Sequence, residues 1–470
     1  MLKDRARLKS NLIGDKAFYK AVFAIIIPFI VQNTISSFVN LLDNLMVGQL
    51  DQTAFNGVGV ANQLFFIFNI CIFGSISGAS IFGAQFYGAG DYENMRASAR
   101  FKLYACVAVF VIGVVVFLAM DDVLLSLFLN DDTRPEEVAL TLQRGKEYLA
   151  IMVLGLLPFA ITQAYASTLR EAGETMLPMV AGIVAVFVNM VGNYILIFGH
   201  FGAPELGVEG AAIATVAGRF VEMGIVMAKA HNVKRYPFME GMYRTIRVPG
   251  KLVKRILIMG APLFLNELLW SVGTSFVSQL YSYRGLDVVA ATNISNTVSN
   301  LFTTAVFSMG NAAAVMVGQA LGADEIPKAR QTAWRLLSFS VFISLGAGIL
   351  LAIASPFIPR LYNATDTARN LACQFLLVQC ATMPFMAFAH TSYFTLRSGG
   401  KTIMTFMFDC MPLWLVNVPM CYALIHFTDL HITLVLFIVN MTNFLKCLFG
   451  FYMVKMGVWI NNVTTQVTGE

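Results

Sequence analysis

The sequence predicts an all-α integral membrane protein with twelve transmembrane helices in two parallel six-helix lobes, related by a pseudo-two-fold axis along the membrane normal. The composition, the length of the apolar stretches and an internal repeat predict this fold. Of the 470 residues, 57% are hydrophobic and 13% are charged, and the mean hydropathy is +0.69. Soluble domains carry about 25% charged residues, so this chain belongs to the membrane class.

Twelve apolar stretches are long enough to cross a bilayer, because a helix needs about 20 residues to span a hydrocarbon core about 30 Å thick. They lie at 18–42, 54–79, 98–119, 147–168, 177–198, 208–230, 256–280, 288–317, 334–355, 371–396, 402–425 and 431–456. The first stretch is too long for the core of a signal peptide and lacks a small-residue cleavage site. It is therefore interpreted as a retained first helix, and each half of the chain receives six spans.

An internal repeat relates the two halves. The residues that recur 234 positions later are Pro28, Gln85, Gly88, Ala89 and Arg96, which return as Pro262, Gln319, Gly322, Ala323 and Arg330. Further on, Thr168-Leu169-Arg170 returns as Thr395-Leu396-Arg397, at an offset of 227. Duplicated apolar chains are typical of transporters, whose substrate path lies between the repeats near the bilayer midplane.

The loop charges predict the orientation. Basic residues concentrate in three segments: the N-terminal segment, the loop that carries Arg96, Arg100 and Lys102, and the stretch 229–255. In contrast, the loops at 199–207 and 425–431 contain no Lys or Arg. Cytoplasmic loops carry the excess of Lys and Arg, so both termini are expected on the cytoplasmic side of the plasma (inner) membrane. Six spans per half is an even number, which makes the repeats parallel. The net charge of +5 is accounted for by these loops and does not indicate nucleic-acid binding.

We therefore predict an N-lobe at 1–228, a cytoplasmic linker at 229–255 and a C-lobe at 256–470. The basic linker could bind anionic lipid, although topology alone explains its charge. All seven cysteines fall in apolar segments, which predicts free thiols.

Polar side chains form stripes on repeat-related spans. The stripe on the first span consists of Gln32, Ser36, Asn40 and Asp43; the one on the seventh and eighth spans consists of Glu267, Ser271, Thr274, Asn293, Asn296 and Asn300. Such stripes must face protein or a water-filled cavity, because unpartnered polar groups are costly in hydrocarbon. Hydrogen bonding between helices is the alternative. Two stripes on equivalent helices favour a substrate cavity.

Ionisable residues inside the spans indicate where ions act. Those that the sequence places there are Asp43, Arg219, Glu222, Glu267, Asp409 and Lys446. Arg219 and Glu222 are three residues apart and are expected to pair or to anchor the helix at the interface. Asp43, Glu267 and Asp409 have no opposite charge at local helical spacing. Buried carboxyls bind protons more readily than exposed ones, as a proton-coupled carrier requires. Structural or interfacial roles remain the alternatives.

Soluble-enzyme motifs do not occur in the sequence. The five histidines show no metal-ligand spacing, and there is no Gly-Lys-Ser/Thr phosphate loop. We predict that the protein is not an enzyme, that it has no cofactor or metal, and that an ion gradient of H⁺ or Na⁺ supplies its energy.

Several motifs are specific to one family. Gly83-Ala84-Gln85-Phe86-Tyr87-Gly88-Ala89-Gly90, the paired Thr-Leu-Arg motifs and Asn193-Tyr194-Ile195-Leu196-Ile197-Phe198-Gly199 are similar to those of multidrug and toxic compound extrusion (MATE) transporters. The resemblance covers essentially the whole chain. It implies a V-shaped pair of lobes with a cleft that opens alternately to either side, and export of cationic amphiphiles against an inflow of sodium ions or protons.

The resemblance also implies site residues. A coupling aspartate on the first helix of family members matches Asp43, with partners that match Asn189 and Thr215. A second aspartate, found in one branch four residues after the asparagine, is here Asn193. One carboxylate suits a proton better than a sodium ion, which stays an alternative at Asp43 or Glu267. Glu267 is similar to a seventh-helix glutamate but lies about a turn away. A tenth-helix aspartate has no counterpart, and Asp409 is the candidate for its place.

The expected partners are a small amphiphilic or cationic substrate and the lipid bilayer, with the protein a monomer. A flippase for lipid-linked oligosaccharides, from the same superfamily, is the main alternative. Such a flippase usually has a more cationic cavity for a pyrophosphate, whereas the intramembrane charges that lack a local partner here are acids. A membrane-embedded enzyme would need a catalytic cluster, which the sequence does not indicate.

Overall fold

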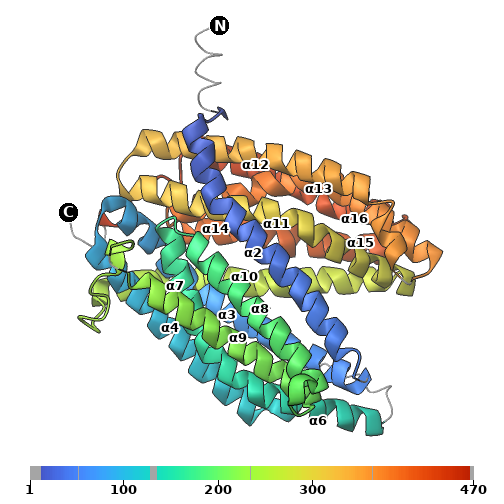
Figure 1. Cartoon of the computed structure of the whole chain (residues 1–470). Coiled ribbons are helices and arrows are strands. Elements are labelled where there is room, and N and C mark those ends of the chain that lie inside the picture. Colours follow the sequence, from blue (N-terminus) through green and yellow to red (C-terminus); the bar gives the residue numbers. More distant parts are fainter. Residues whose placement is uncertain (1–11, 51, 127–134, 233, 363, 466–470) are drawn as a thin grey trace. The chain divides into compact units, whose positions relative to one another are not determined.

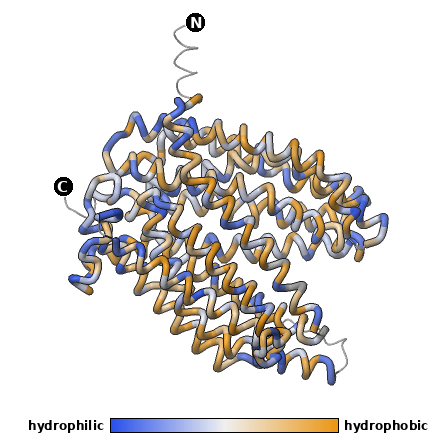
Figure 2. The backbone as a smooth tube through the Cα atoms, in the orientation of Figure 1, coloured by the Kyte–Doolittle hydropathy of each residue, from blue (hydrophilic) through white to orange (hydrophobic). Residues whose placement is uncertain are grey.

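The computed structural model describes residues 12–50, 52–126, 135–232, 234–362 and 364–465, and it shows long helices through most of them (Figure 1). Twelve helical stretches in these ranges are long and apolar enough to cross a membrane. Figure 2 shows hydrophobic residues along most of the length of these helices and hydrophilic residues concentrated at helix ends and loops. The predicted all-α membrane fold is confirmed.

The first half of the chain supplies six of these stretches. They are α2 (Lys16–Val47), α3 (Gln52–Ala89), α4 (Tyr92–Ala119), α6 (Pro135–Met152) with η1 (Val153–Gly155) and α7 (Leu156–Glu171), α8 (Met176–Phe198) and α9 (Gly207–Ala230). A short helix, α5 (Asp121–Ser126), lies between α4 and α6, and a short 3₁₀ turn, η3 (Pro237–Met239), follows α9. The helices run past the apolar spans because polar residues continue them at either end.

The second half supplies the other six. They are α10 (Gly250–Ser282), α11 (Leu286–Gly322), α12 (Ile326–Ala354), α13 (Asp366–Ser398), α14 (Thr402–Pro412) with η5 (Leu413–Asn417) and α15 (Val418–Phe427), and α16 (Ile432–Asn440) with α17 (Thr442–Met456). The segment η5 is a π-helix.

The sequence repeat is also a repeat of backbone conformation. Pro28 lies inside α2, and its partner Pro262 lies inside α10. Gly173 after α7 and Gly400 after α13 both have positive φ, at 82° and 72°. Glycine adopts this left-handed conformation without the steric cost that other residues bear. The repeated glycine therefore ends the same helix in each half.

Contacts divide the chain into two compact units. The N unit contains residues 31–83 and 92–253, and the C unit contains the described residues of 1–30, 84–91 and 254–470. The predicted lobes follow chain order, so the units differ from them at the start of α2 and the end of α3. They also place residues 229–253 of the predicted linker in the N unit. Phe18, Val22 and Ile26 explain the first difference, because they are buried in an apolar cluster with residues of α11, α12 and α13.

Each unit has its own apolar core. In the N unit, buried side chains of α3, α6 and α7 such as Leu64, Leu149 and Leu156 pack together. In the C unit, a second cluster joins α11, α13 and α16 through residues such as Val298 and Leu376. Because lipid tails are as apolar as these side chains, close van der Waals packing, and not removal from water, is what stabilises each unit within the bilayer.

The end of α3 crosses α11 inside the C unit at unusually close range. A Cβ atom on Gly88 would lie 2.0 Å from the backbone oxygen of Gln319, and one on Gly322 would lie 1.8 Å from that of Gln85. These four residues are repeat partners, so the contact is reciprocal. The buried Gln85 side chain donates to the carbonyls of Ser398 and Asn461, at 2.8 and 3.1 Å, and accepts from the backbone N–H of Val463 at 2.7 Å.

Candidate functional site

A cavity of about 360 Å³, the N cavity, lies among α2, α3, α6, α8 and α9 of the N unit. The residues that line it are Asp43, Val47, Val58, Asn62, Phe65, Phe66, Asn69, Tyr148, Met152, Asn193, Ala211, Thr215 and Arg219. Its walls combine aromatic and aliphatic side chains with nearly as many polar ones, so the N cavity is more polar than a usual small-molecule site. Among these described residues, only Asp43 and Arg219 carry a formal charge at neutral pH.

The carboxylate of Asp43 is the centre of a hydrogen-bond network. The Nδ2 atom of Asn193 donates to Asp43 Oδ1 at 2.6 Å. In the amide orientation that satisfies both of its ends, Asn189 donates to the two carboxylate oxygens at 3.1 and 3.0 Å and lies 3.0 Å from Thr215 Oγ1. The structure therefore brings together Asp43, Asn189, Asn193 and Thr215, the four residues that the family resemblance groups at one site.

The amides present N–H groups to the carboxylate, and this affects which ion fits. Hydrogen-bond donors stabilise a carboxylate, but they do not supply the oxygen ligands that a hard cation needs. The Oδ1 atom of Asn193 is buried and has no hydrogen-bond partner among the described residues. It is a hydrogen-bond acceptor that the network around Asp43 leaves unused.

Arg219 contacts the cavity wall rather than Glu222. Its Nη1 donates to the carbonyl of Gly155 at 3.3 Å, and its guanidinium lies 5.1 Å from the ring centroid of Phe159. Among the described residues, Arg219 and Glu222 form no hydrogen bond or direct ion pair, although their opposite charges attract each other. The alternative, that they anchor the helix at the interface, stays a prediction.

The remaining residues of the first-span stripe lie outside the N cavity. Gln32 packs beside Gly182, where a Cβ would lie 2.8 Å from the Gln32 amide nitrogen. Ser36 is half-buried and lines neither this cavity nor the one in the C unit. The side chain of Asn40 is outside the described residues.

The C unit holds a second polar cluster, formed by α10, α13, α14 and α17. Lys446 Nζ donates to Asp409 Oδ1 at 2.8 Å, and Asn266 Nδ2 donates to Asp409 Oδ2 at 3.2 Å. Tyr393 donates to Glu267 Oε1 at 3.4 Å. Asp409 thus has a cationic partner, which corrects the expectation from local spacing. Lys446 lies on another helix, 37 residues away, so helical spacing could not reveal it.

A second cavity, of about 340 Å³ and called the C cavity, lies elsewhere in the C unit. Thr274, Asn296 and Asn300 of the predicted stripe line it. Ser271 is half-buried and Asn293 is exposed, and neither is among the lining residues. Only part of the predicted polar stripe therefore lines the C cavity.

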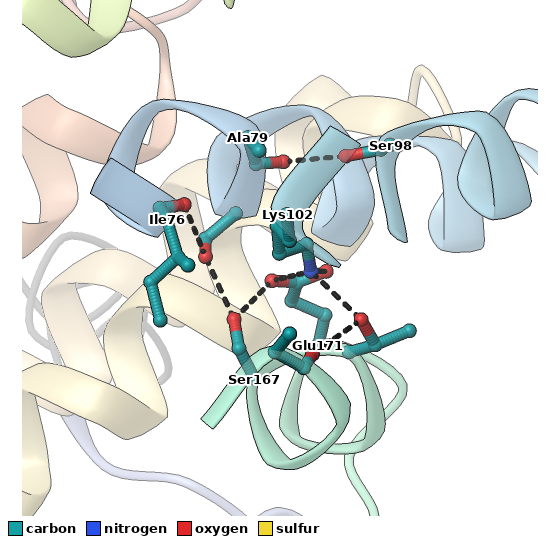
Figure 3. Close-up of polar contacts among 9 residues, drawn as sticks. Ile76, Ala79, Ser98, Lys102, Ser167 and Glu171 are labelled. Carbon is teal, nitrogen blue, oxygen red and sulfur yellow. Dashed lines mark hydrogen bonds and ion pairs between the residues drawn. The ribbon is translucent and has the colours of Figure 1, made fainter. Parts of the chain in front are cut away.

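A buried ion pair in the N unit was not predicted at all. Lys102 Nζ lies 2.6 Å from both carboxylate oxygens of Glu171 and 3.0 Å from Thr168 Oγ1, and Ser167 donates to Glu171 Oε1 at 2.9 Å (Figure 3). The two charged side chains are 1% and 6% exposed. Lys102 was expected among the loop cations, but α4 begins at Tyr92, and Lys102 lies within this helix and is buried. Glu171 directly follows the first Thr-Leu-Arg motif, and it is the residue in the sequence that could have indicated a buried partner for Lys102.

Comparison with known proteins gives a consistent result. A family model described as MatE matches residues 28–195 and 262–423 of this chain. The chain is 24% identical over 416 residues to a probable multidrug resistance protein NorM of Thermotoga maritima, with 87% of this chain and 86% of that protein covered. It is 25% identical over 421 residues to a probable multidrug resistance protein YoeA of Bacillus subtilis, with 88% of each covered.

Solved structures agree on the fold. One described as the outward-facing conformation of a multidrug resistance MATE family transporter has a TM-score of 0.83 at 20% identity, with 95% of this chain and 97% of that chain covered. A variant of a Vibrio cholerae MATE transporter has a TM-score of 0.84 at 18% identity, with 97% and 99% covered. The family model matches one segment in each half of the chain, in agreement with the repeat seen in the sequence.

Proposed function

Because this chain belongs to the MatE family, we propose that it is an antiporter that exports small cationic or amphiphilic molecules across the plasma membrane by alternating access, with protons as the coupling ion. The names of its relatives as multidrug resistance proteins support efflux. The observation that carries the assignment is the placement of Asp43, held by two amides in the wall of the N cavity.

The charge of the N cavity suggests how exchange would work. With Asp43 ionised, its charge balances that of Arg219, and a cationic substrate can be held near the carboxylate. A proton on Asp43 leaves Arg219 as the net charge, which repels the cation. At about 4 Å and an effective dielectric constant of about 20, one such charge is worth roughly 4 kcal/mol. A proton and a cationic substrate would therefore compete for the same carboxylate.

Protons are favoured over sodium ions because of what surrounds Asp43. Asn193 directs its N–H group to Asp43 at 2.6 Å, and Asn189 does so at 3.0 and 3.1 Å in the orientation that satisfies both of its ends when no ion is bound. A sodium ion would require several oxygen ligands, and both amides would have to turn. A proton needs only the carboxylate. Glu267, with Tyr393 as its partner, remains the candidate for a separate ion site in the C unit.

Transport into inverted membrane vesicles tests this proposal. Uptake of the fluorescent cation ethidium is followed with sodium and pH gradients imposed separately. An acid-interior gradient should drive uphill uptake in the wild type, and Asp43→Asn should abolish it, because asparagine keeps the shape of aspartate but cannot exchange a proton. Expression and thermal stability should be unchanged.

Asp429→Asn makes the same chemical change at an exposed loop position and should transport normally. Uphill transport retained by Asp43→Asn would contradict the coupling role. Sodium-driven uptake at zero pH gradient, without proton movement, would show that sodium is the coupling ion. Failure to export any of a panel of cations, together with translocation of lipid-linked oligosaccharide, would favour the flippase.

A further inference from the structure

Two helices of the C unit lose their regular geometry where they border the C cavity. α14 passes into the π-helix η5 (Leu413–Asn417) before α15, and α16 ends at Asn440 before α17 begins at Thr442. Their repeat counterparts, α8 and α9, run uninterrupted for 23 and 24 residues. Backbone that departs from the α-helix at membrane depth occurs where it lines a cavity or is covered by protein, and π segments are frequent at functional sites.

The residues at both irregularities line the C cavity. Asn417 is the last residue of η5, while Asn440 and Asn443 flank the break between α16 and α17. Interrupted helices are the usual walls of binding sites in transporters because they free polar groups from helical hydrogen bonding. The C unit therefore departs from its repeat partner in the helices that build this cavity.

The walls of the C cavity are polar but uncharged. Six amide side chains line it, namely Asn296, Asn300, Gln379, Asn417, Asn440 and Asn443. Hydroxyl groups come from α10, α11 and α13, and Phe307, Met383 and Met386 add an apolar side. None of the lining residues, all within the described part of the chain, carries a formal charge. The N cavity, with Asp43 and Arg219, has a different character.

Two of these amides have unused acceptor atoms. The Oε1 of Gln379 and the Oδ1 of Asn417 are buried, and neither has a hydrogen-bond partner among the described residues. A buried acceptor without a partner costs about 1–3 kcal/mol. A bound molecule that donates N–H or O–H groups would remove this cost at both positions.

We propose that the C cavity binds an uncharged small molecule with an apolar or aromatic body and at least two N–H or O–H donors, separately from the Asp43 site. An ion would lose its hydration there without gaining a counter-charge, whereas a neutral donor would satisfy Gln379 and Asn417. The two methionines can adapt to an aromatic body. A volume of about 340 Å³ lies at the lower end of the range for small-molecule sites. The proposal rests on the proposed transport function and extends its substrates to neutral compounds.

Equilibrium binding to the purified full chain in lipid nanodiscs tests the proposal with two probes. The neutral aryl glycoside 4-methylumbelliferyl β-glucoside carries hydroxyl donors, whereas tetraphenylphosphonium is a permanent cation without any. Gln379→Leu and Asn417→Leu should each weaken glucoside binding about five- to tenfold, as the loss of one hydrogen bond predicts, and leave tetraphenylphosphonium binding within about twofold. Gln379→Met, which keeps the length of glutamine, should behave like Gln379→Leu.

Gln279→Leu is the matched control, because Gln279 is exposed on α10 and does not line the cavity. It should bind both probes like the wild type. Asp43→Asn should keep glucoside binding even though it loses uphill export, so the two proposals can fail independently. Absence of saturable glucoside binding by a wild type that binds tetraphenylphosphonium would overturn the proposal. An equal loss of both probes in the Gln379 and Asn417 variants would also overturn it.

Discussion

The side chain of Asn193 contacts Asp43, and its chemical type determines how many carboxylates the N cavity holds. Asn193 donates to Asp43 at 2.6 Å, and its own Oδ1 has no partner among the described residues. Asn193→Asp would place a second carboxylate at this distance, and two adjacent carboxylates must share a proton or a cation. We expect sodium binding to strengthen by at least about tenfold, a gain of about 1.4 kcal/mol.

Binding of radioactive sodium to the purified protein measures this change. Asp43→Asn combined with Asn193→Asp restores a single carboxylate and should bind sodium as weakly as the wild type. Unchanged sodium affinity in the Asn193→Asp variant would show that the N cavity is not the ion site.

The buried Lys102–Glu171 pair leads to a prediction about stability. Removing one member of a buried ion pair leaves an uncompensated charge and typically costs about 3–5 kcal/mol. Lys102→Met should therefore lower the thermal stability of the protein in detergent sharply. The double variant Lys102→Met with Glu171→Met should recover much of this loss, because apolar side chains of similar size replace the whole pair. If the double variant is less stable than the single one, the pair is not the source of the effect.

Side-chain partners on different helices were the part of the site that sequence alone could not supply. Helical spacing identifies neighbours three or four residues apart, but Asp409 and Lys446 are separated by 37 positions and Lys102 and Glu171 by 69. Asp43, Asn189 and Thr215 were predicted together because the family resemblance carries long-range information. Composition and hydrophobic periodicity contain no information about contacts between residues far apart in the sequence.

At the scale of the helix, the crossing of α3 and α11 depends on two glycines. A methyl group on Gly88 or Gly322 would lie within 2.0 Å of backbone atoms of the other helix, which cannot move aside as a flexible side chain can. Gly88→Ala and Gly322→Ala should each destabilise the protein by several kcal/mol, which exceeds the gain of about 1 kcal/mol in helix propensity. Thermal unfolding measures the difference.

Gly59→Ala, also on α3, is the control for this prediction. A Cβ at Gly59 meets no atom within 4 Å, so only the favourable effect on helix propensity remains. This variant should be as stable as the wild type or more so. Equal stability of all three alanine variants would contradict the close approach.

The positions of the transmembrane helices could be predicted from the sequence, but the irregular turns within them could not. A stretch of apolar residues long enough to cross the bilayer identifies a span whatever its internal register. The π-helix at Leu413–Asn417 changes the helical register without changing the hydropathy, and the irregular turn at Met441 leaves the hydropathy unchanged as well. The sequence therefore predicted spans at 402–425 and 431–456 but not the irregular backbone that borders the C cavity.

For the whole molecule, the loop charges lead to a prediction about topology. Alkaline phosphatase fused after Glu470 should be inactive in a bacterial host, because the C-terminus is expected in the cytoplasm. The same enzyme fused after Ala203, in the cation-free loop between α8 and α9, should be active. Green fluorescent protein at the same two positions should give the reverse pattern. Activity of the C-terminal phosphatase fusion would contradict the predicted orientation.

The sequence repeat predicts two halves of six spans each, but it does not predict which compact unit every segment belongs to. The repeat places six spans in each half, whereas residues 84–91 make their contacts with the second half. α3 is 38 residues long, more than the roughly 20 that a bilayer requires. Its last residues belong to the other compact unit, which hydropathy cannot indicate.

The Lys102–Glu171 pair also limits how the two halves could have diverged after duplication. By the repeat offsets of 234 and 227, the counterparts of these residues are Leu336 and Ser398, both buried. Any mutational path from the neutral pair to the charged pair, in either direction, changes one position first and passes through an ancestor with a lone buried charge. Such an ancestor would have been less stable by several kcal/mol. Whichever substitution came first therefore had to be tolerated at this cost until the second one restored a balanced pair.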